Sequence, residues 1–150
     1  MKKKILITTG GSGGHVLPAI TIYDHLKVKY DVLISTDLRG HKYLDSDIYK
    51  VFVVNTPRLN KLILLPFAII KVFFLTLKSL FLLKREKIEI LISTGGYMSL
   101  PLCLAAKMRN IKIFLLEPNM IIGRANRFFL NFCEKIICYD SNVIGFPDKF

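Results

Sequence analysis

A glycine-rich segment that ends in a histidine is the part of this sequence best suited to chemistry. Residues 10–18 read GGSGGHVLP, so four glycines surround one serine and His15 follows them. Glycine leaves the backbone free to adopt positive φ and leaves its N–H groups unobstructed, and a helix that begins just after such a loop adds unpaired N–H donors. We therefore expect an anion-binding loop for a phosphate group, formed by Gly10, Gly11, Ser12, Gly13 and Gly14.

The imidazole of His15 suits two roles. Histidine titrates near neutral pH, so this residue is a candidate to remove a proton from a substrate, and its place beside the glycine amides would equally allow contact with a phosphate. A tight turn without a ligand is the alternative for the whole segment, but a turn requires one or two glycines rather than four.

The better-known phosphate motifs do not fit this loop. A dinucleotide fingerprint, Gly-x-Gly-x-x-Gly, would need a glycine where Val16 stands. A Walker loop counted from Gly10 would need glycine at His15 and lysine at Val16. The segment is therefore predicted to be a phosphate loop of another kind.

Two further segments place polar or flexible residues after apolar runs. Residues 93–99 read STGGYMS, a second glycine loop in which Ser99 is a candidate N-cap of a following helix. Residues 116–119 read LEPN. Here Glu117 is a candidate general base or hydrogen-bond acceptor for a ligand, or alternatively a cap of the next helix, and Asn119 is a candidate ligand contact or a turn residue.

These segments lie in a pattern that alternates strand and helix. Strands are predicted at 4–8, 31–35, 51–54, 89–93, 112–116 and 135–139, and helices at 16–27, 61–85, 99–108 and 124–132. Such alternation predicts an α/β fold with a doubly wound parallel sheet, formed by residues 1–150 as one domain. Ligands of such sheets bind beyond the carboxyl ends of the strands, where the loops 9–15, 94–98 and 117–123 should meet.

The amino-acid composition indicates which kinds of partner and which cellular compartment to expect. Lys and Arg number 22 against 11 Asp and Glu, a net charge of +11 that favours anionic partners. No motif for nucleic acid accompanies this charge, so phosphorylated substrates and an acidic membrane surface are the better candidates. The cysteines Cys103, Cys133 and Cys138 form no CxxC pair and are predicted to be reduced, and no secretory signal is recognised, so the protein is expected in the cytoplasm.

Residues 59–85 form an unusually apolar segment with a basic stripe. Lys71, Lys78 and Arg85 recur every seven residues, so on a helix they lie about 20° apart per step. The length would span a bilayer, but central lysines are costly there, so a helix lying flat on anionic headgroups is preferred. The predicted membrane contacts are Lys61, Lys71, Lys78 and Arg85; a core helix with snorkelling lysines is the alternative.

Together the three loops resemble those of the MurG family, inverting glycosyltransferases of the GT-B fold. The segments that carry the resemblance are GGSGGHVLP at 10–18, STGGYMSLP at 93–101 and LEPN at 116–119, where the family has HEQN; Leu116 and Pro118 therefore depart from its pattern. The resemblance implies the Rossmann-like amino-terminal half of an enzyme that makes lipid II in peptidoglycan synthesis. That enzyme moves N-acetylglucosamine from UDP-N-acetylglucosamine to the 4-hydroxyl of undecaprenyl-diphospho-N-acetylmuramoyl-pentapeptide (lipid I), without a metal or other cofactor.

The resemblance also implies roles for individual residues. His15 and Glu117 become the catalytic candidates. The acceptor diphosphate is assigned to the two glycine loops, at Gly10, Gly11, Ser12, Gly13, Gly14, Gly95, Gly96 and Tyr97. Contacts with UDP-N-acetylglucosamine are assigned to Ser12, Gly13, Gly14 and Asn119.

The expected place of such a protein is the cytoplasmic face of the inner membrane, attached peripherally. A GT-B enzyme reacts between two domains, and 150 residues accommodate only the first, so the carboxyl-terminal donor domain is expected to be missing or separate and the chain to be inactive alone. Two alternatives remain. One is a non-catalytic subunit that recruits a split glycosyltransferase to the membrane; the other is a nucleotide-binding Rossmann module in which Asp37 holds a ribose hydroxyl.

Overall fold

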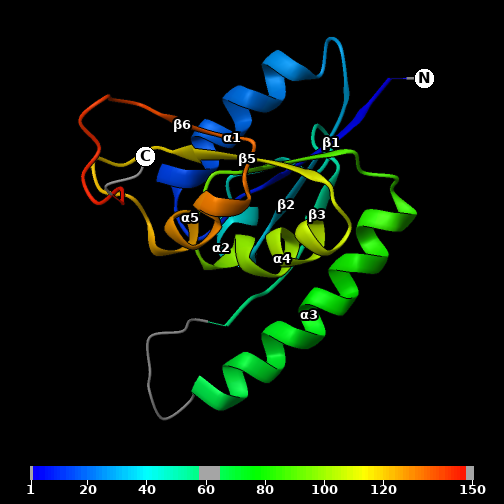
Figure 1. Ribbon diagram of the computed structural model, residues 1–150. Coiled ribbons are helices and arrows are strands. Elements are labelled where there is room, and N and C mark those ends of the chain that lie inside the picture. The colour runs from blue at the N-terminus through cyan, green and yellow to red at the C-terminus, as the bar shows by residue number, and fades with distance from the viewer. Residues whose placement is uncertain (1, 58–64, 148–150) are drawn as a thin grey trace.

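Six parallel strands form a single sheet with helices on both faces. The computed structural model describes residues 2–57 and 65–147. The strand order is β3-β2-β1-β4-β5-β6, so the predicted doubly wound parallel sheet is confirmed (Figure 1). The strands are β1 Lys4–Thr8, β2 Asp31–Thr36, β3 Val51–Val53, β4 Ile90–Ser93, β5 Lys112–Glu117 and β6 Lys135–Cys138. The helices are α1 Gly13–Leu26, α2 Leu38–His41, α3 Leu65–Arg85, α4 Leu100–Met108 and α5 Arg124–Phe129, with 3-10 turns η2 Tyr97–Ser99 and η3 Leu130–Phe132.

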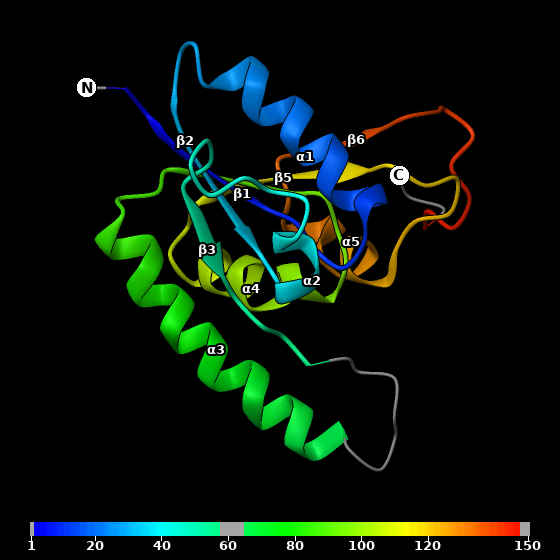
Figure 2. The ribbon, with the colours of Figure 1, turned by 180° about the vertical axis from the view of Figure 1, so that it is seen from behind.

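The helices divide between the two faces as right-handed crossovers require. Seen from behind, α1 lies on one face of the sheet, and α3, α4 and α5 lie on the other (Figure 2). The larger core lies on the second face, where Leu6, Leu91 and Leu115 of the central strands pack with Leu102 of α4 and Phe129 of α5. These strands are almost entirely apolar because both of their faces are covered.

The sheet reverses its winding between β1 and β4. Thr8, the last residue of β1, pairs with Ser35 of β2 on one side and with Ser93 of β4 on the other. Chain connections leave in opposite directions at this point, which opens a crevice above the strand ends. The two glycine loops follow β1 and β4 directly, so the fold places both of them at this crevice.

The helix boundaries differ from the sequence predictions in informative ways. Helix α1 begins at Gly13 rather than Val16, so Gly13, Gly14 and His15 form its first turn. Ser99 occupies the N-cap position of α4, but its hydroxyl donates to the carbonyl oxygen of Gly96 at 2.8 Å and caps no helical N–H. The short α2 has no predicted counterpart, because four residues cannot show a helical period.

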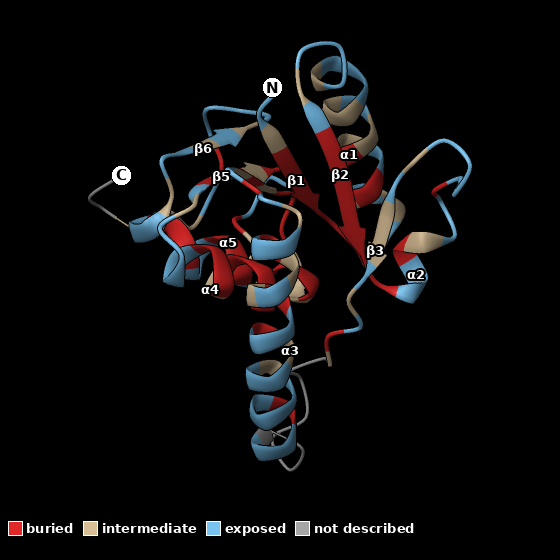
Figure 3. Ribbon diagram, turned by 90° about the vertical axis from the view of Figure 1, so that its right-hand side faces the viewer, coloured by how far each residue is buried: buried red, intermediate tan, exposed pale blue. Residues whose placement is uncertain are grey.

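Helix α3 extends well beyond the sheet. Its buried residues, Ala68, Thr76, Ser79 and Leu83, lie on the side that packs towards α4. The rest of the helix projects from the domain, and most of its surface is exposed (Figure 3). The predicted beginning of this helix at Lys61, and the predicted membrane contact of Lys61, lie outside the described residues.

Candidate functional site

The two glycine loops are joined at the crevice by backbone and side-chain hydrogen bonds. The amide of Thr94 donates to the carbonyl oxygen of Thr8 at 3.1 Å, which extends the β1–β4 ladder into the loops. The buried hydroxyl of Thr94 also donates to the hydroxyl of Thr9 at 2.8 Å. Residues 85 positions apart in the chain are thus fixed side by side, as the sheet topology predicted.

A cavity of about 280 Å³ opens beside these loops and is lined by six of the predicted catalytic and ligand-binding residues, but by none of residues 10–14. Its lining comprises His15, Gly95, Gly96, Tyr97, Glu117, Asn119, Gly123, Arg124 and Ala125. The first six were predicted from the sequence. The last three come from the beginning of α5 and the residue before it, which the sequence pattern did not connect with the site.

His15 is held in one tautomer by the second glycine loop. Its Nδ1 lies 2.7 Å from the carbonyl oxygen of Thr94, and a carbonyl only accepts hydrogen bonds. In the neutral ring the proton is therefore on Nδ1, and Nε2 carries the free lone pair. Because His15 lines the cavity, this arrangement leaves a proton acceptor there.

The second glycine loop needs glycine at both of its positions. Gly95 and Gly96 have φ of +87° and +81°, a region that other residues rarely adopt. A Cβ atom on Gly95 would also lie 3.1 Å from the side-chain nitrogen of Asn126. At Gly96 the nearest atoms would be the carbonyl oxygen of Gly10 and Cδ2 of His15, at 3.8 and 4.0 Å, so this glycine keeps the space beside the imidazole open.

Glu117 is a buried carboxylate with a full set of donors. It is 1% exposed, and its Oε1 accepts hydrogen bonds from the amide and side-chain nitrogens of Asn119 at 3.1 and 2.8 Å. Its Oε2 accepts from the amide of Gly123 at 2.8 Å and from the side chain of Asn126 at 3.0 Å. Gly123 is the N-cap residue of α5, so the geometry matches the capping alternative for Glu117 more closely than that of a free base.

Asn126 connects the second and third loops, although the sequence gave no reason to single it out. Its side-chain nitrogen donates to the carbonyl oxygen of Leu116 at 2.9 Å as well as to Glu117, and it lies against Gly95. Asn119, in contrast, is exposed at the cavity, and its side-chain nitrogen is occupied by Glu117. Its amide oxygen and the second N–H of its side-chain nitrogen are the groups that it can offer to a ligand.

The first glycine loop offers fewer amides than its sequence suggests. The N–H of Gly11, at φ +88°, donates to Oδ1 of Asp37 at 3.0 Å, so this predicted phosphate donor is already engaged. Gly10 is enclosed, because a Cβ atom there would collide with Met98. Ser12 and Gly14 are exposed, and with Gly13 they form the beginning of α1, which is where the free N–H donors of a helix lie.

Asp37 is buried and holds the first glycine loop to the residues that follow β2. Its side chain is 3% exposed, and its oxygens accept hydrogen bonds from Gly11, from Gly40 at 2.8 Å and from Nε of Arg39 at 2.9 Å. Burial opposes ionisation of Asp37, but these hydrogen bonds outweigh it and hold the pKa of the carboxyl below its ordinary value of 3.8. Because the Asp37 side chain is almost fully buried and already accepts three hydrogen bonds within the loops, the structure gives no support to a role for Asp37 in holding a ribose hydroxyl.

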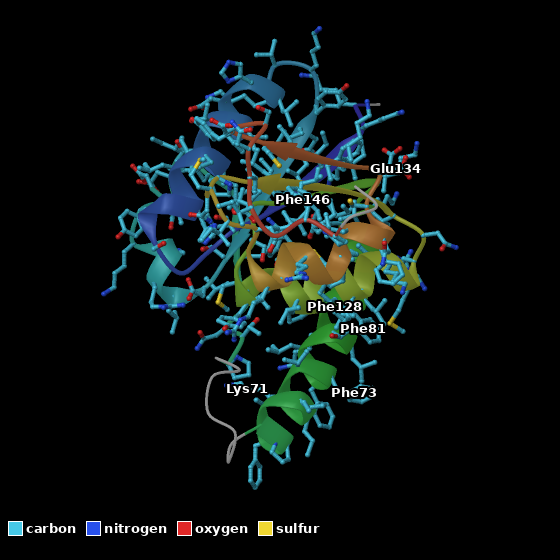
Figure 4. All side chains as sticks on the ribbon, turned by 60° about the vertical axis from the view of Figure 1, so that its left-hand side comes forward. Lys71, Phe73, Phe81, Phe128, Glu134 and Phe146 are labelled. Atoms are coloured by element: carbon cyan, nitrogen blue, oxygen red, sulfur yellow. The ribbon has the colours of Figure 1, made fainter. Side chains whose placement is uncertain are left out.

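A second surface feature lies on α3, which carries three distinct faces. Opposite the packed face, a broad arc of exposed apolar residues comprises Phe67, Ile69, Ile70, Phe73, Phe74, Leu77 and Phe81. Lys71, Lys78 and Arg85 are exposed along one border of this arc, and Nε of Arg85 lies 3.2 Å from a carboxylate oxygen of Glu86. Figure 4 shows Phe73 and Phe81 on one side of the helix and Lys71 on the other. By length and composition alone, Pro66–Arg85 is long and apolar enough to cross a membrane.

Comparisons with known proteins support the family resemblance that the three loops indicated. The model of the glycosyltransferase family 28 N-terminal domain matches residues 5–138. A relative from Pelagibacter ubique, named UDP-N-acetylglucosamine–N-acetylmuramyl-(pentapeptide) pyrophosphoryl-undecaprenol N-acetylglucosamine transferase, is 52% identical over all of this chain and 42% of its own length. A relative of the same name from Rickettsia bellii is 36% identical over 97% of this chain and 40% of its own length.

A solved structure supports the fold. The crystal structure of MurG from Acinetobacter baumannii superposes with a TM-score of 0.82 at 20% identity, covering 95% of this chain and 43% of that one. The chain thus spans about two fifths of the length of each of these relatives.

Proposed function

The chain belongs to glycosyltransferase family 28, as an amino-terminal domain of the MurG type, and from this premise we propose that it supplies the acceptor half of a lipid II-forming transferase. The reaction moves N-acetylglucosamine from UDP-N-acetylglucosamine to the 4-hydroxyl of lipid I with inversion at the sugar. The observation that carries the proposal is the hydrogen bond from Nδ1 of His15 to the carbonyl oxygen of Thr94, which leaves Nε2 as a base in a cavity lined by His15, the second glycine loop and the third loop.

In this proposal His15 is the general base. Its Nε2 takes the proton of the acceptor hydroxyl as that oxygen forms a bond to C1 of the donor sugar and the bond from C1 to the UDP oxygen breaks. The imidazolium that results is stabilised by its Nδ1–H bond to the carbonyl oxygen of Thr94. No metal or other cofactor is assigned a role in this half of the reaction.

The loops divide the ligands between them. The acceptor diphosphate is assigned to the exposed start of α1 and to the second glycine loop, with Tyr97 at its rim. Ser12, Gly13, Gly14 and the amide oxygen of Asn119 are assigned to the side of the site that faces the donor. Glu117, with all of its acceptor positions engaged, is proposed as a positioning residue that fixes Asn119 and the start of α5.

Peripheral attachment to the cytoplasmic face of the inner membrane is assigned to α3. The exposed apolar arc would enter the acyl boundary, and the bordering Lys71, Lys78 and Arg85 would meet anionic headgroups. Since both acceptor and membrane are anionic, the net charge of +11 favours each encounter.

The test is a chimera in which residues 1–150 are joined to the remaining part of the Pelagibacter ubique relative, whose identity of 52% favours a compatible domain interface. Transfer of labelled N-acetylglucosamine from UDP-N-acetylglucosamine to a lipid I analogue is expected. A folded chimera that binds lipid I but gives no transfer would favour the non-catalytic recruiting subunit. A chimera that binds neither lipid I nor the donor would contradict the proposal.

A further inference from the structure

Arg39 is fixed beside the first glycine loop by a buried carboxylate. Its Nε donates to Oδ2 of Asp37 at 2.9 Å, and the Asp37 side chain is only 3% exposed, whereas that of Arg39 is 46% exposed. Asp37 is itself anchored, because its Oδ1 accepts hydrogen bonds from the amides of Gly11 and Gly40. The guanidinium is therefore held from its inner side while its outer side stays accessible to solvent.

The Nη2 group of this guanidinium lies beside Gly11 of the loop. Nη2 of Arg39 is 3.4 Å from the position that a Cβ atom on Gly11 would occupy, and nothing else comes as near to that position. Glycine at position 11 thus allows the guanidinium to approach the loop, in addition to allowing its positive φ. Within residues 2–57 and 65–147, the hydrogen bond and ion pair recorded for Arg39 both use Nε, so its Nη groups retain donors for a ligand.

We propose that Arg39 contacts the acceptor diphosphate at the first glycine loop, an inference that rests on the proposed function. A guanidinium is permanently charged, and its planar pair of N–H donors matches two oxygens of one phosphate. The engaged amide of Gly11 removes one backbone donor from the loop, and the Nη groups of Arg39 bring donors to the same place. Asp37 is then a positioning residue: it shapes the loop and orients the arginine through a single carboxylate.

The binding of inorganic pyrophosphate to the 150-residue chain, measured by isothermal titration calorimetry, tests this contact. Arg39→Gln should raise the Kd about tenfold or more, because a hydrogen bond to a charged group is lost. Arg39→Lys, which keeps the charge without the paired donors, should fall between wild type and Arg39→Gln. Arg127→Gln is the matched control, since Arg127 is exposed on α5 and, unlike Arg39, does not lie beside Gly11; its Kd should stay within about twofold of wild type. Circular dichroism and Tm confirm that each variant is folded.

A variant in the first glycine loop distinguishes failure of the Arg39 contact from failure of the diphosphate site itself. Position 14 is open, so Gly14→Asp should fold and should repel pyrophosphate from the start of α1. If Gly14→Asp loses binding while Arg39→Gln binds like wild type, the Arg39 contact is wrong and the diphosphate site stands. If Arg127→Gln weakens binding as much as Arg39→Gln, the effect is one of net charge and the contact is again wrong. Failure of the wild-type chain to bind pyrophosphate would contradict both the contact and the diphosphate site.

Discussion

His15 and Thr94 lie 79 residues apart in the sequence, yet Nδ1 of the histidine is 2.7 Å from the carbonyl oxygen of the threonine. This contact exists because β1 and β4 are neighbours at the point where the strand order reverses. It fixes the ring plane and the tautomer together, so a residue in the first turn of α1 presents a base to a cavity formed largely by other loops.

The first prediction concerns His15 as the base. In the two-domain chimera, His15→Gln should lower kcat by about 10²- to 10⁴-fold, because glutamine cannot take a proton in the transition state. The KM for UDP-N-acetylglucosamine should change little, since the proton moves only during the reaction. Steady-state kinetics give both values, and His25→Gln, on the exposed far end of α1, is the control. A kcat within about threefold of wild type would exclude His15 as the base.

The second prediction concerns Asn126 as the link between the second and third loops. Asn126→Ala removes the hydrogen bonds to Leu116 and to the buried carboxylate of Glu117, and it should reduce the free energy of unfolding by about 1–3 kcal/mol. Urea denaturation of the 150-residue chain measures this. Asn119→Ala removes a bond to the same carboxylate from an exposed position and should cost clearly less. An equal loss of unfolding free energy in the two variants would show that the buried position of Asn126 does not make its hydrogen bonds more stabilising.

The third prediction concerns attachment through α3. Replacing Lys71, Lys78 and Arg85 together with glutamate should release the chain from vesicles that contain anionic lipid, since each headgroup contact contributes about 1 kcal/mol. High salt should weaken binding of the wild type for the same reason. The charge-matched control replaces three exposed lysines outside α3, Lys29, Lys42 and Lys135. Binding is measured by co-sedimentation with the vesicles. If both triple variants lose binding equally, net charge rather than α3 governs attachment.

The fourth prediction concerns acid stability. The folded pKa of Asp37 is held below 3.8, so the stabilisation that its ionised form provides is complete above that value and is lost as pH falls through the lower folded pKa. Unfolding free energy measured in urea should therefore fall from about pH 4 downward, and Asp37→Asn should flatten this dependence. The exposed Asp47→Asn should leave the slope unchanged. If the unfolding free energy of Asp37→Asn fell with pH as steeply as that of the wild type, other titrating groups would be responsible for the acid sensitivity.

The sequence predicted the parts of this site that local patterns control. Apolar runs defined the six strands, and the glycines after two of them marked the loops that meet at the crevice. Because parallel strands end at one edge, the meeting of His15, Gly96 and Asn119 followed from the order of elements alone. The sequence predicted positive φ in the first glycine loop, where it occurs at Gly11; the second loop also has it, at Gly95 and Gly96.

The rest depends on contacts between distant residues. Nothing local to Asn126 or Arg124 indicates that α5 begins beneath the second glycine loop. One part of the role of Asp37 could have been predicted from local sequence, because aspartate is a preferred N-cap residue and here accepts from the amide of Gly40, three residues later. Its hydrogen bond with Gly11 joins residues distant in the sequence and could not have been predicted in this way. The sequence allowed Glu117 to be either a general base or a helix cap. The structure favours the cap, because four hydrogen bonds already occupy its carboxylate oxygens.

The last prediction concerns the 150-residue chain by itself, which should bind acceptor but show no transferase turnover. The proposed base and the proposed diphosphate contacts lie within this chain, whereas the helix end that would stabilise departing UDP is assigned to a donor domain. The relatives are more than twice as long as the part of them that this chain matches, which leaves room for such a domain. A radiochemical assay with UDP-N-acetylglucosamine and a lipid I analogue should detect product with the chimera and none with the chain alone. Mixing the chain with the separately expressed remainder of the Pelagibacter ubique relative should restore activity in proportion to complex formation. Turnover by the chain alone would show that residues 1–150 contain a complete donor site and would overturn the division of the reaction between two domains.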